Sequence, residues 1–202
     1  NAYRMYHASR VRLDSLPLSK VHEEVCFAID REAACAALSA TITLVGSSSL
    51  SLRPAAPQTS TFAKADTLNK YMEARDLYVR LANIWHTLKS NASVAEEAAH
   101  HTSLSLHKAM LCCLAANDPW TADKVIELGF ELDDASFRES AQCRRMNRTL
   151  ELFSATDIDA FADAILEWEG KWHLSRWMIL MHQAALNAMK ASQRKFVESA
   201  LP

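Results

Sequence analysis

The chain has 202 residues, of which 50% are hydrophobic, and this is enough apolar material to bury the core of a domain. Its formal net charge of −2 at pH 7 excludes the strongly basic balance that is typical of nucleic-acid-binding proteins. With only 3 glycines and 5 prolines, the tight turns that connect β-strands are scarce, so an all-α fold is predicted.

The cysteines and the apolar segments indicate the cellular compartment. The 5 cysteines are odd in number and have no framework spacing, which favours reduced thiols. No run approaches about 18 apolar residues, so no transmembrane helix is expected, and the first residues lack a signal-peptide pattern. We therefore expect a cytoplasmic protein. The sequence begins with Asn1 rather than Met, which leaves open whether an N-terminal part precedes it.

The chain is expected to have three parts. Residues 1–45 are predicted to form a helical repeat portion, with helices on either side of Pro17. Residues 46–65 are rich in Ser, Thr and Pro, which predicts a flexible loop with little to bury. Residues 66–202 are predicted to form helical hairpins and a terminal bundle, with at least five helices between residues 66 and 198.

After this loop, apolar residues recur at helical spacing. Arg75 is the one polar member of the stripe, and we expect it to pair or to extend its charge to solvent. The stripe itself is typical of a helix face that packs into a core. Its members are Leu68, Tyr71, Arg75, Tyr78, Leu81, Trp85 and Leu88.

Polar capping residues divide the rest of the chain into helices. They predict one helix from Pro119 to about Glu131 and another from Phe137 to Phe153. Gly170 is expected just after the end of a later helix, where glycine is favoured. Short links of about 2–5 residues would make successive helices antiparallel, as in a degenerate tetratricopeptide-like array. The predicted capping residues are Ser93 with Glu96, Asp118 before Pro119, Ser136, and Thr156.

Four segments of the second half of the chain occur in a characteristic order: KAMLC at 108–112, SAQCRRMNRTLE at 140–151, EWE at 167–169 and LSRWM at 174–178. Their order and spacing resemble the C-terminal region of the soluble NSF attachment proteins, the SNAP adaptors of membrane fusion. The resemblance is clear over roughly residues 70–181. It implies an all-α superhelix of tetratricopeptide-like antiparallel hairpins that ends in a C-terminal helical bundle.

The resemblance also implies a function. SNAPs are non-catalytic adaptors that link SNARE complexes to an NSF-type AAA ATPase, and they associate peripherally with membranes from the cytoplasm. The same role is therefore expected here, with a SNARE bundle and an NSF-type AAA ATPase as partners. The alternative left open is a generic helical scaffold for another protein complex.

Acidic residues are the first candidate site. Asp159, Asp163 and Glu167 are spaced four apart and share one helix face, which fits either a solvated face or a docking surface for a basic partner. SNAPs use acidic residues to engage basic domains of the ATPase, and by position two acids of the family are Ser154 and Ala155 here. The candidate ATPase-binding residues are Glu151, Asp118, Asp159, Asp163, Glu167, Glu198 and Leu201.

Basic residues are the second candidate site. Arg144 and Arg148 are four apart, and Arg138 and Arg145 are seven apart, so two basic faces of one helix are predicted. They fit either a solvated helix or, as the resemblance implies, contact with the acidic surface of a SNARE bundle. All four arginines are candidate SNARE-binding residues.

Residues for catalysis or for metal binding form no recognisable set. His100, His101 and His107 lie near Cys112 and Cys113, but the paired-cysteine knuckle of zinc sites is missing. Glycine-rich phosphate loops and nucleophile motifs are also missing. We therefore expect no enzyme activity, no cofactor, no metal, no small-molecule substrate and no nucleic acid partner.

Overall fold

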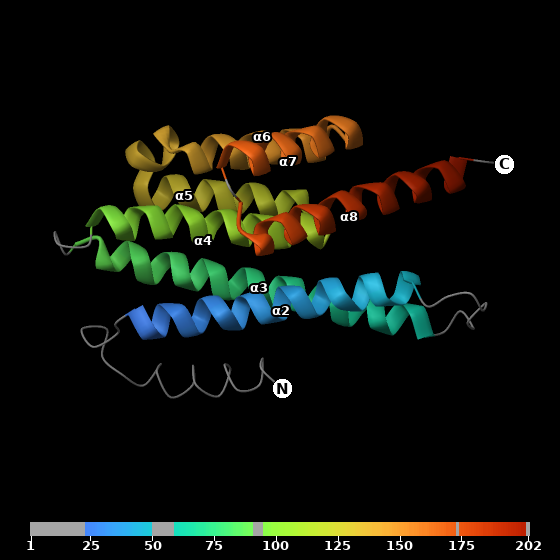
Figure 1. Cartoon of the computed structure of the whole chain (residues 1–202), viewed down its shortest axis with the longest axis horizontal. Coiled ribbons are helices and arrows are strands. Elements are labelled where there is room, and N and C mark those ends of the chain that lie inside the picture. Colours follow the sequence, from blue (N-terminus) through green and yellow to red (C-terminus); the bar gives the residue numbers. More distant parts are fainter. Residues whose placement is uncertain (1–22, 50–58, 91–94, 173, 201–202) are drawn as a thin grey trace. The chain divides into compact units, whose positions relative to one another are not determined.

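The computed structural model describes residues 23–49, 59–90, 95–172 and 174–200. Within these ranges the chain forms seven α-helices and no strand, so the predicted all-α class is confirmed (Figure 1). The superhelical tetratricopeptide-like arrangement stays a prediction. The helices are α2 (Glu23–Ser49), α3 (Thr59–Leu88), α4 (Ala95–Ala115), α5 (Pro119–Glu139), α6 (Ala141–Ser154), α7 (Ile158–Trp172) and α8 (Arg176–Ala200).

The chain divides into two compact units, residues 1–105 and residues 106–202, which we call the N-terminal and C-terminal units. In the N-terminal unit, α2 and α3 pack as an antiparallel hairpin (Figure 1). A row of buried alanines on α2 lets the two helix axes approach closely, because alanine has the smallest side chain that still favours a helix. These alanines are Ala33, Ala36, Ala37 and Ala40.

The predicted stripe on α3 is the face that packs. Tyr71 and Tyr78 are fully buried, and the hydroxyl groups of Tyr71 and Thr41 lie 3.0 Å apart across the hairpin. Arg75 pairs with Asp76, at 2.7 Å between Arg75 Nε and Asp76 Oδ1, which confirms the expectation that it pairs. Trp85 is buried and its ring stacks on His101 with 4.6 Å between the ring centroids.

The C-terminal unit contains the end of α4 together with α5, α6, α7 and α8. Helices α5, α6 and α7 alternate in direction, so the α4–α5 turn, the α6–α7 turn and the end of α8 lie at the same end of the unit (Figure 1). One hydrogen bond supports this arrangement, because the Ser192 hydroxyl of α8 donates to Asn117 Oδ1 in the α4–α5 turn over 3.1 Å. The core of the C-terminal unit includes several side chains with almost no exposed surface: Met110, Met146, Phe161, Met181 and Met189.

The α4–α5 turn has the predicted caps. Asp118 is the N-cap of α5, and its two carboxylate oxygens accept hydrogen bonds from the backbone N–H and the hydroxyl of Thr121, over 3.0 and 2.6 Å. Pro119 occupies the first helical position, where a missing N–H costs no hydrogen bond. Asn117 precedes them with φ of 63°, a left-handed conformation that Asn tolerates better than most residues.

Three other predicted helix boundaries were wrong. The N-cap of α6 is Ser140, whose hydroxyl oxygen accepts from Cys143 N–H over 3.0 Å, and Ser136 lies inside α5. At the start of α7 the Asp157 carboxylate accepts from Ala160 N–H, while Thr156 has a left-handed φ of 57°. Gly170 lies within α7 and has no positive φ, so it does not end that helix.

Helix α5 continues beyond Glu131, where the sequence predicted its end, and the absence of a side chain at Gly129 leaves room for a ring from its last turns. A Cβ atom at Gly129 would lie 2.3 Å from Cε1 of Phe137, a ring that is 2% exposed. Eight residues of a straight helix span about 12 Å, so this contact requires α5 to bend back toward its own middle. The ring of Phe130 completes the arrangement, edge-on to Phe137 at 5.5 Å. The glycine therefore allows a bend in the helix rather than a break.

The helices also extend into the loop expected at 46–65, since α2 ends at Ser49 and α3 begins at Thr59. The predicted cap Ser93 and the helix predicted before Pro17 lie outside the described residues. Within the described part of the chain, none of the helices combines the length and the hydropathy that crossing a bilayer requires.

Candidate partner-binding surface

The acidic residues of α7 form an exposed row. Asp159, Asp163 and Glu167 are all exposed, and within the described residues none of them has an ion-pair or hydrogen-bond partner from its side chain. Because these three residues are spaced four apart, their carboxylates lie on one side of the helix. The opposite side of α7 buries Phe161, Ile165 and Trp168. This side of α7 therefore presents unneutralised negative charge to solvent.

An apolar residue lies within the same row. Leu166 is 66% exposed and is seven residues after Asp159, so it falls between the carboxylates on the same face. The sequence interpretation missed Leu166, although an apolar residue on an otherwise acidic face was visible in the spacing. Gly170 continues the row, and nothing lies within 4 Å of a Cβ built on it. We call Asp159, Asp163, Leu166 and Glu167 the α7 stripe.

Two further acidic candidates lie at the end of the unit where this stripe starts. Glu151 is exposed in the last turn of α6, a few residues before α7 begins, and its carboxylate is 3.4 Å from Arg148 Nη1. Asp118 lies in the α4–α5 turn at the same end of the unit, but both of its oxygens are used in the helix cap. The expected acidic positions Ser154 and Ala155 are exposed there as well.

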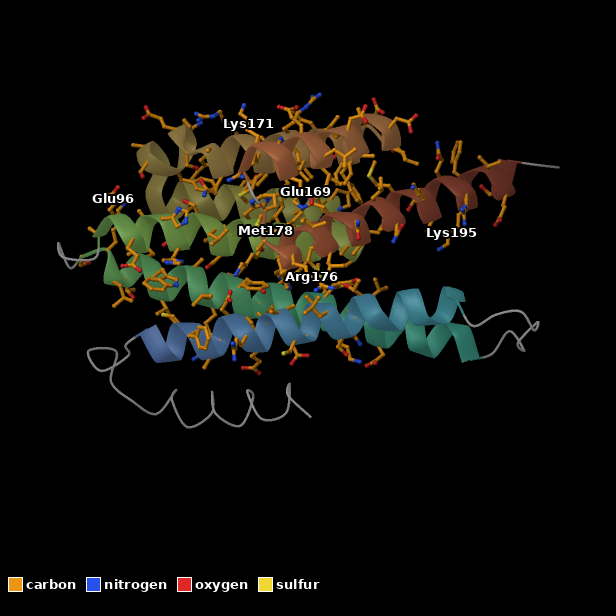
Figure 2. All side chains as sticks on the ribbon, in the orientation of Figure 1. Glu96, Glu169, Lys171, Arg176, Met178 and Lys195 are labelled. Carbon is orange, nitrogen blue, oxygen red and sulfur yellow. The ribbon has the colours of Figure 1, made fainter. Side chains whose placement is uncertain are left out.

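One of the two tail candidates, Glu198, belongs to the end of α8. Glu198 is exposed in the last turn of that helix, beside Phe196 and Val197, which are 74% and 53% exposed. Figure 2 labels Lys195 in this part of α8. Leu201 lies outside the described residues. The structure thus brings Asp118, Glu151, Asp159 and the end of α8 to one end of the C-terminal unit, while Glu167 lies two turns further along α7.

The predicted pair of basic faces on one helix was wrong. Ser140 has an extended backbone between α5 and α6, so Arg138 and Arg145 belong to different helices. Their separation of seven residues therefore does not put them on one helix face. Arg138 is exposed and its guanidinium carbon lies 4.5 Å from the centroid of the Phe130 ring. Arg144 and Arg148 are exposed on α6, where Arg144 donates to the carbonyl oxygen of Glu139 over 2.8 Å.

Arg145 differs from the other three arginines. Its side chain is half-buried, and burial lowers its pKa from the usual value. Its Nε atom is buried, so the inner part of the guanidinium faces the interior of the C-terminal unit. Arg145 is therefore poorly placed to contact a large partner.

The three cysteines of the C-terminal unit lie in its interior. Cys112, Cys113 and Cys143 are buried, and burial raises the pKa of the Cys143 thiol, which keeps it protonated and unreactive.

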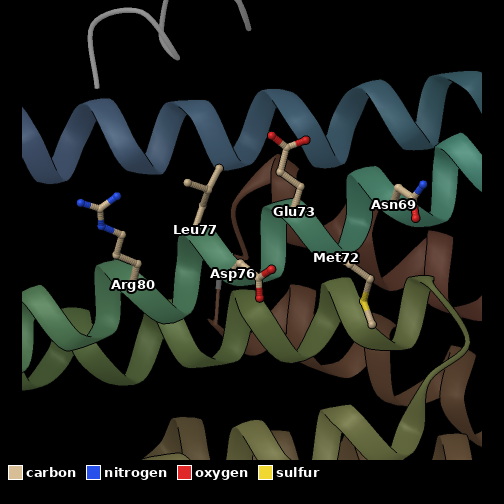
Figure 3. A pocket seen from close by; sticks show the side chains of 6 residues that line it. All are labelled: Asn69, Met72, Glu73, Asp76, Leu77 and Arg80. Atoms are coloured by element: carbon tan, nitrogen blue, oxygen red, sulfur yellow. The ribbon is translucent and has the colours of Figure 1, made fainter. Parts of the chain in front are cut away.

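A shallow, open hollow lies on α3 in the N-terminal unit (Figure 3). It is formed by one polar helix face rather than by convergent elements, and its lining residues are Asn69, Met72, Glu73, Asp76, Leu77 and Arg80.

These features define a class of protein, namely a helical protein that exposes a row of acidic residues with one apolar residue among them, the α7 stripe. A comparison with known families then identifies the segment. Residues 102–190 match the family model described as soluble NSF attachment protein, SNAP. The resemblance predicted from the four motifs is thereby confirmed for this range, which begins in α4 and includes the α7 stripe and most of α8. Comparisons with curated proteins and with solved structures return no match.

Proposed function

We propose that this protein is a SNAP-type adaptor that links SNARE complexes to an NSF-type AAA ATPase without chemistry of its own. The observation that carries the proposal is the family match over residues 102–190, which covers the helices that bear the α7 stripe and the exposed arginines. Such an adaptor would act in the cytoplasm with peripheral membrane association, and the ATPase would supply the work of SNARE disassembly.

The α7 stripe is the proposed contact with the ATPase. Unpaired carboxylates attract a basic partner over distances of about 10 Å at 0.1 M salt, while exposed Leu166 can be buried at the centre of the contact. Glu151 extends this contact toward the α6–α7 turn, and Glu198 and Leu201 are proposed to extend it along the tail. Asp118 is a weaker member because its carboxylate already caps α5.

The exposed arginines are the proposed contact with the SNARE bundle. Arg144 and Arg148 are exposed on α6, and Arg138 is exposed at the end of α5. Their planar guanidinium groups can bind carboxylates of an acidic partner in a bidentate manner. We leave Arg145 out of this surface because its side chain is half-buried.

One observation favours the alternative of a generic helical scaffold. Ser154 and Ala155 are exposed at positions where the resemblance implies acidic residues, so part of the charge for ATPase docking is missing. If the scaffold alternative holds, the α7 stripe is a solvated face and its charge has no effect on ATPase binding.

A binding experiment separates the two proposals. Immobilised chain is incubated with purified NSF-type ATPase in the presence and absence of SNARE bundle, at 50 and 200 mM salt. We expect SNARE-dependent capture that weakens with salt and with Asp163→Lys, mainly through slower association. Glu96→Lys is the matched control, because Glu96 is exposed on α4 outside the matched segment (Figure 2). Capture that responds to neither salt nor Asp163→Lys supports the scaffold.

The tail is tested by ATP turnover. At saturating adaptor, Leu201→Ala is expected to lower stimulated hydrolysis while adaptor binding is largely kept, because one apolar side chain can favour a productive ATPase arrangement. Equal turnover with both proteins removes Leu201 from the site. If even the wild-type chain fails to stimulate turnover, the adaptor proposal itself is contradicted.

A further inference from the structure

Two completely buried histidines lie in the C-terminal unit, and the proposed docking surfaces use neither of them. His107 of α4 and His182 of α8 are both 0% exposed, and their rings meet edge to face with 5.9 Å between centroids. The ring of Trp168, from α7, lies 5.8 Å from that of His182. The pair therefore connects α8 to two other helices of the unit.

The hydrogen bonding of this pair is incomplete. His182 Nδ1 lies 2.8 Å from the carbonyl oxygen of Met178, so it carries the proton and donates in the neutral ring. The Nε2 atom of His182 and both ring nitrogens of His107 have no hydrogen-bond partner within the described residues. Because buried polar atoms are nearly always satisfied, these three nitrogens mark the pair as an unusual part of this core.

The surrounding charges disfavour imidazolium at both positions. From α6, the guanidinium of Arg145 acts on both histidines, and from α7 the neighbour is the uncharged indole of Trp168. Burial lowers the pKa of His107 well below its usual value, and the charges of His182 and Arg145 lower it further. Burial also lowers the pKa of His182 to about 4, despite the opposing hydrogen bond to Met178. No carboxylate acts on either ring in the described part of the chain.

We propose that His107 and His182 form an acid-sensitive latch, which holds α8 against the rest of the C-terminal unit at neutral pH and releases it in mild acid. The packed core accepts only neutral rings, since each ring faces the other and Arg145. When α8 separates, both rings reach water and can take up protons. Protonation therefore stabilises the open state and leaves the closed state unchanged.

The pH range follows from the direction of these shifts. A histidine in water titrates at 6.5, and His182 in the closed state titrates at about 4, so the latch weakens as pH falls from about 6.5 toward about 4. Above pH 6.5 the rings are neutral in both the open and the closed state, so pH no longer changes the ratio of the two states. Between pH 7.5 and 5.5 the ratio of open to closed forms should rise roughly tenfold for each histidine and roughly a hundredfold for the pair.

Hydrogen–deuterium exchange of the full chain measures this opening. Backbone amides in residues 178–189 of α8 are compared at pH 7.5 and 5.5, after correction for the intrinsic pH dependence of exchange. We expect wild-type protection to fall about a hundredfold, His182→Gln protection to fall about tenfold, and the His107→Gln/His182→Gln double variant to show little pH dependence. His100→Gln, an exposed position on α4, is the control and should behave as wild type.

A second measurement keeps the test decisive if the glutamine variants fail to fold. In the wild-type protein, proton NMR of the imidazole rings is followed from pH 7.5 to 5.5. Two of the 8 histidine signals should stay unshifted while the fold remains closed. The latch is ruled out if all imidazoles titrate near their usual pKa in the intact fold. It is also ruled out if the pH dependence of α8 protection is equally small in wild type and double variant.

Discussion

The bend in α5 makes a sharp prediction about its glycine. Replacing Gly129 by Ala places a methyl carbon 2.3 Å from Phe137 Cε1, 2.5 Å from Cζ and 2.7 Å from Cδ1. Non-bonded carbons prefer about 3.5–4.0 Å, so the ring would have to move by more than about 1 Å. Phe137 is 2% exposed and its ring contacts Phe130 edge-on, so no free space receives it.

The magnitude follows from two opposing effects. Overpacking of a well-filled core costs about 1–3 kcal/mol, while alanine in place of glycine in a helix gains about 1 kcal/mol. We therefore expect Gly129→Ala to lower the free energy of unfolding by about 0–2 kcal/mol. Gly170→Ala is the matched control, because its methyl group meets nothing within 4 Å and it should raise the free energy by about 0.5–1 kcal/mol.

Urea denaturation followed by far-UV circular dichroism measures both variants. A third variant, Gly129→Ala with Phe137→Leu, tests the cause, because a smaller side chain at 137 should make the added methyl less harmful. Its double-mutant cycle should show coupling of about 1 kcal/mol or more. The proposed bend is refuted if Gly129→Ala is as stable as Gly170→Ala, or if the cycle shows no coupling.

Three further predictions concern turns and thiols. Thr156→Gly should raise the free energy of unfolding by about 1 kcal/mol, because glycine adopts φ of 57° without strain; an unchanged melting temperature would contradict this. Asp118→Ala should lower it by about 1 kcal/mol through loss of the cap on Thr121, and an unaltered urea midpoint would show that this cap is dispensable. In alkylation followed by mass spectrometry at pH 8, buried Cys143 should react far more slowly than the half-buried Cys35, and equal rates would contradict the raised thiol pKa.

The helical class and the packing face of α3 could be predicted because both depend on which residues are apolar and at what spacing. Tyr71, Tyr78 and Trp85 are buried as the stripe required. The turn at Asp118 and Pro119 was also predictable, since both residues favour the same conformation. In these cases the local conformational preferences agree with one another, and the tertiary packing does not oppose them.

The other boundaries depended on contacts that the sequence does not display. Ser136 is as suitable a cap as Ser140, but the space at Gly129 accepts the Phe137 ring and lets α5 run past Ser136. The shift of this boundary then separated Arg138 from Arg145, so the predicted pair of faces was lost. The inward position of Arg145 was equally hidden, because arginine spacing alone gives no information about burial.

The ion pair between Arg148 and Glu151 has a thermodynamic consequence for an adaptor with two partners. Both side chains are largely exposed and 3.4 Å apart, so the pair contributes only about 0–1 kcal/mol. An acidic ligand that engages Arg148 would release Glu151 for a basic ligand, and the reverse holds equally. Because such linkage is reciprocal, each ligand could raise the affinity of the other by at most about fivefold through this pair. One weak surface contact would thus make the two binding events mildly cooperative.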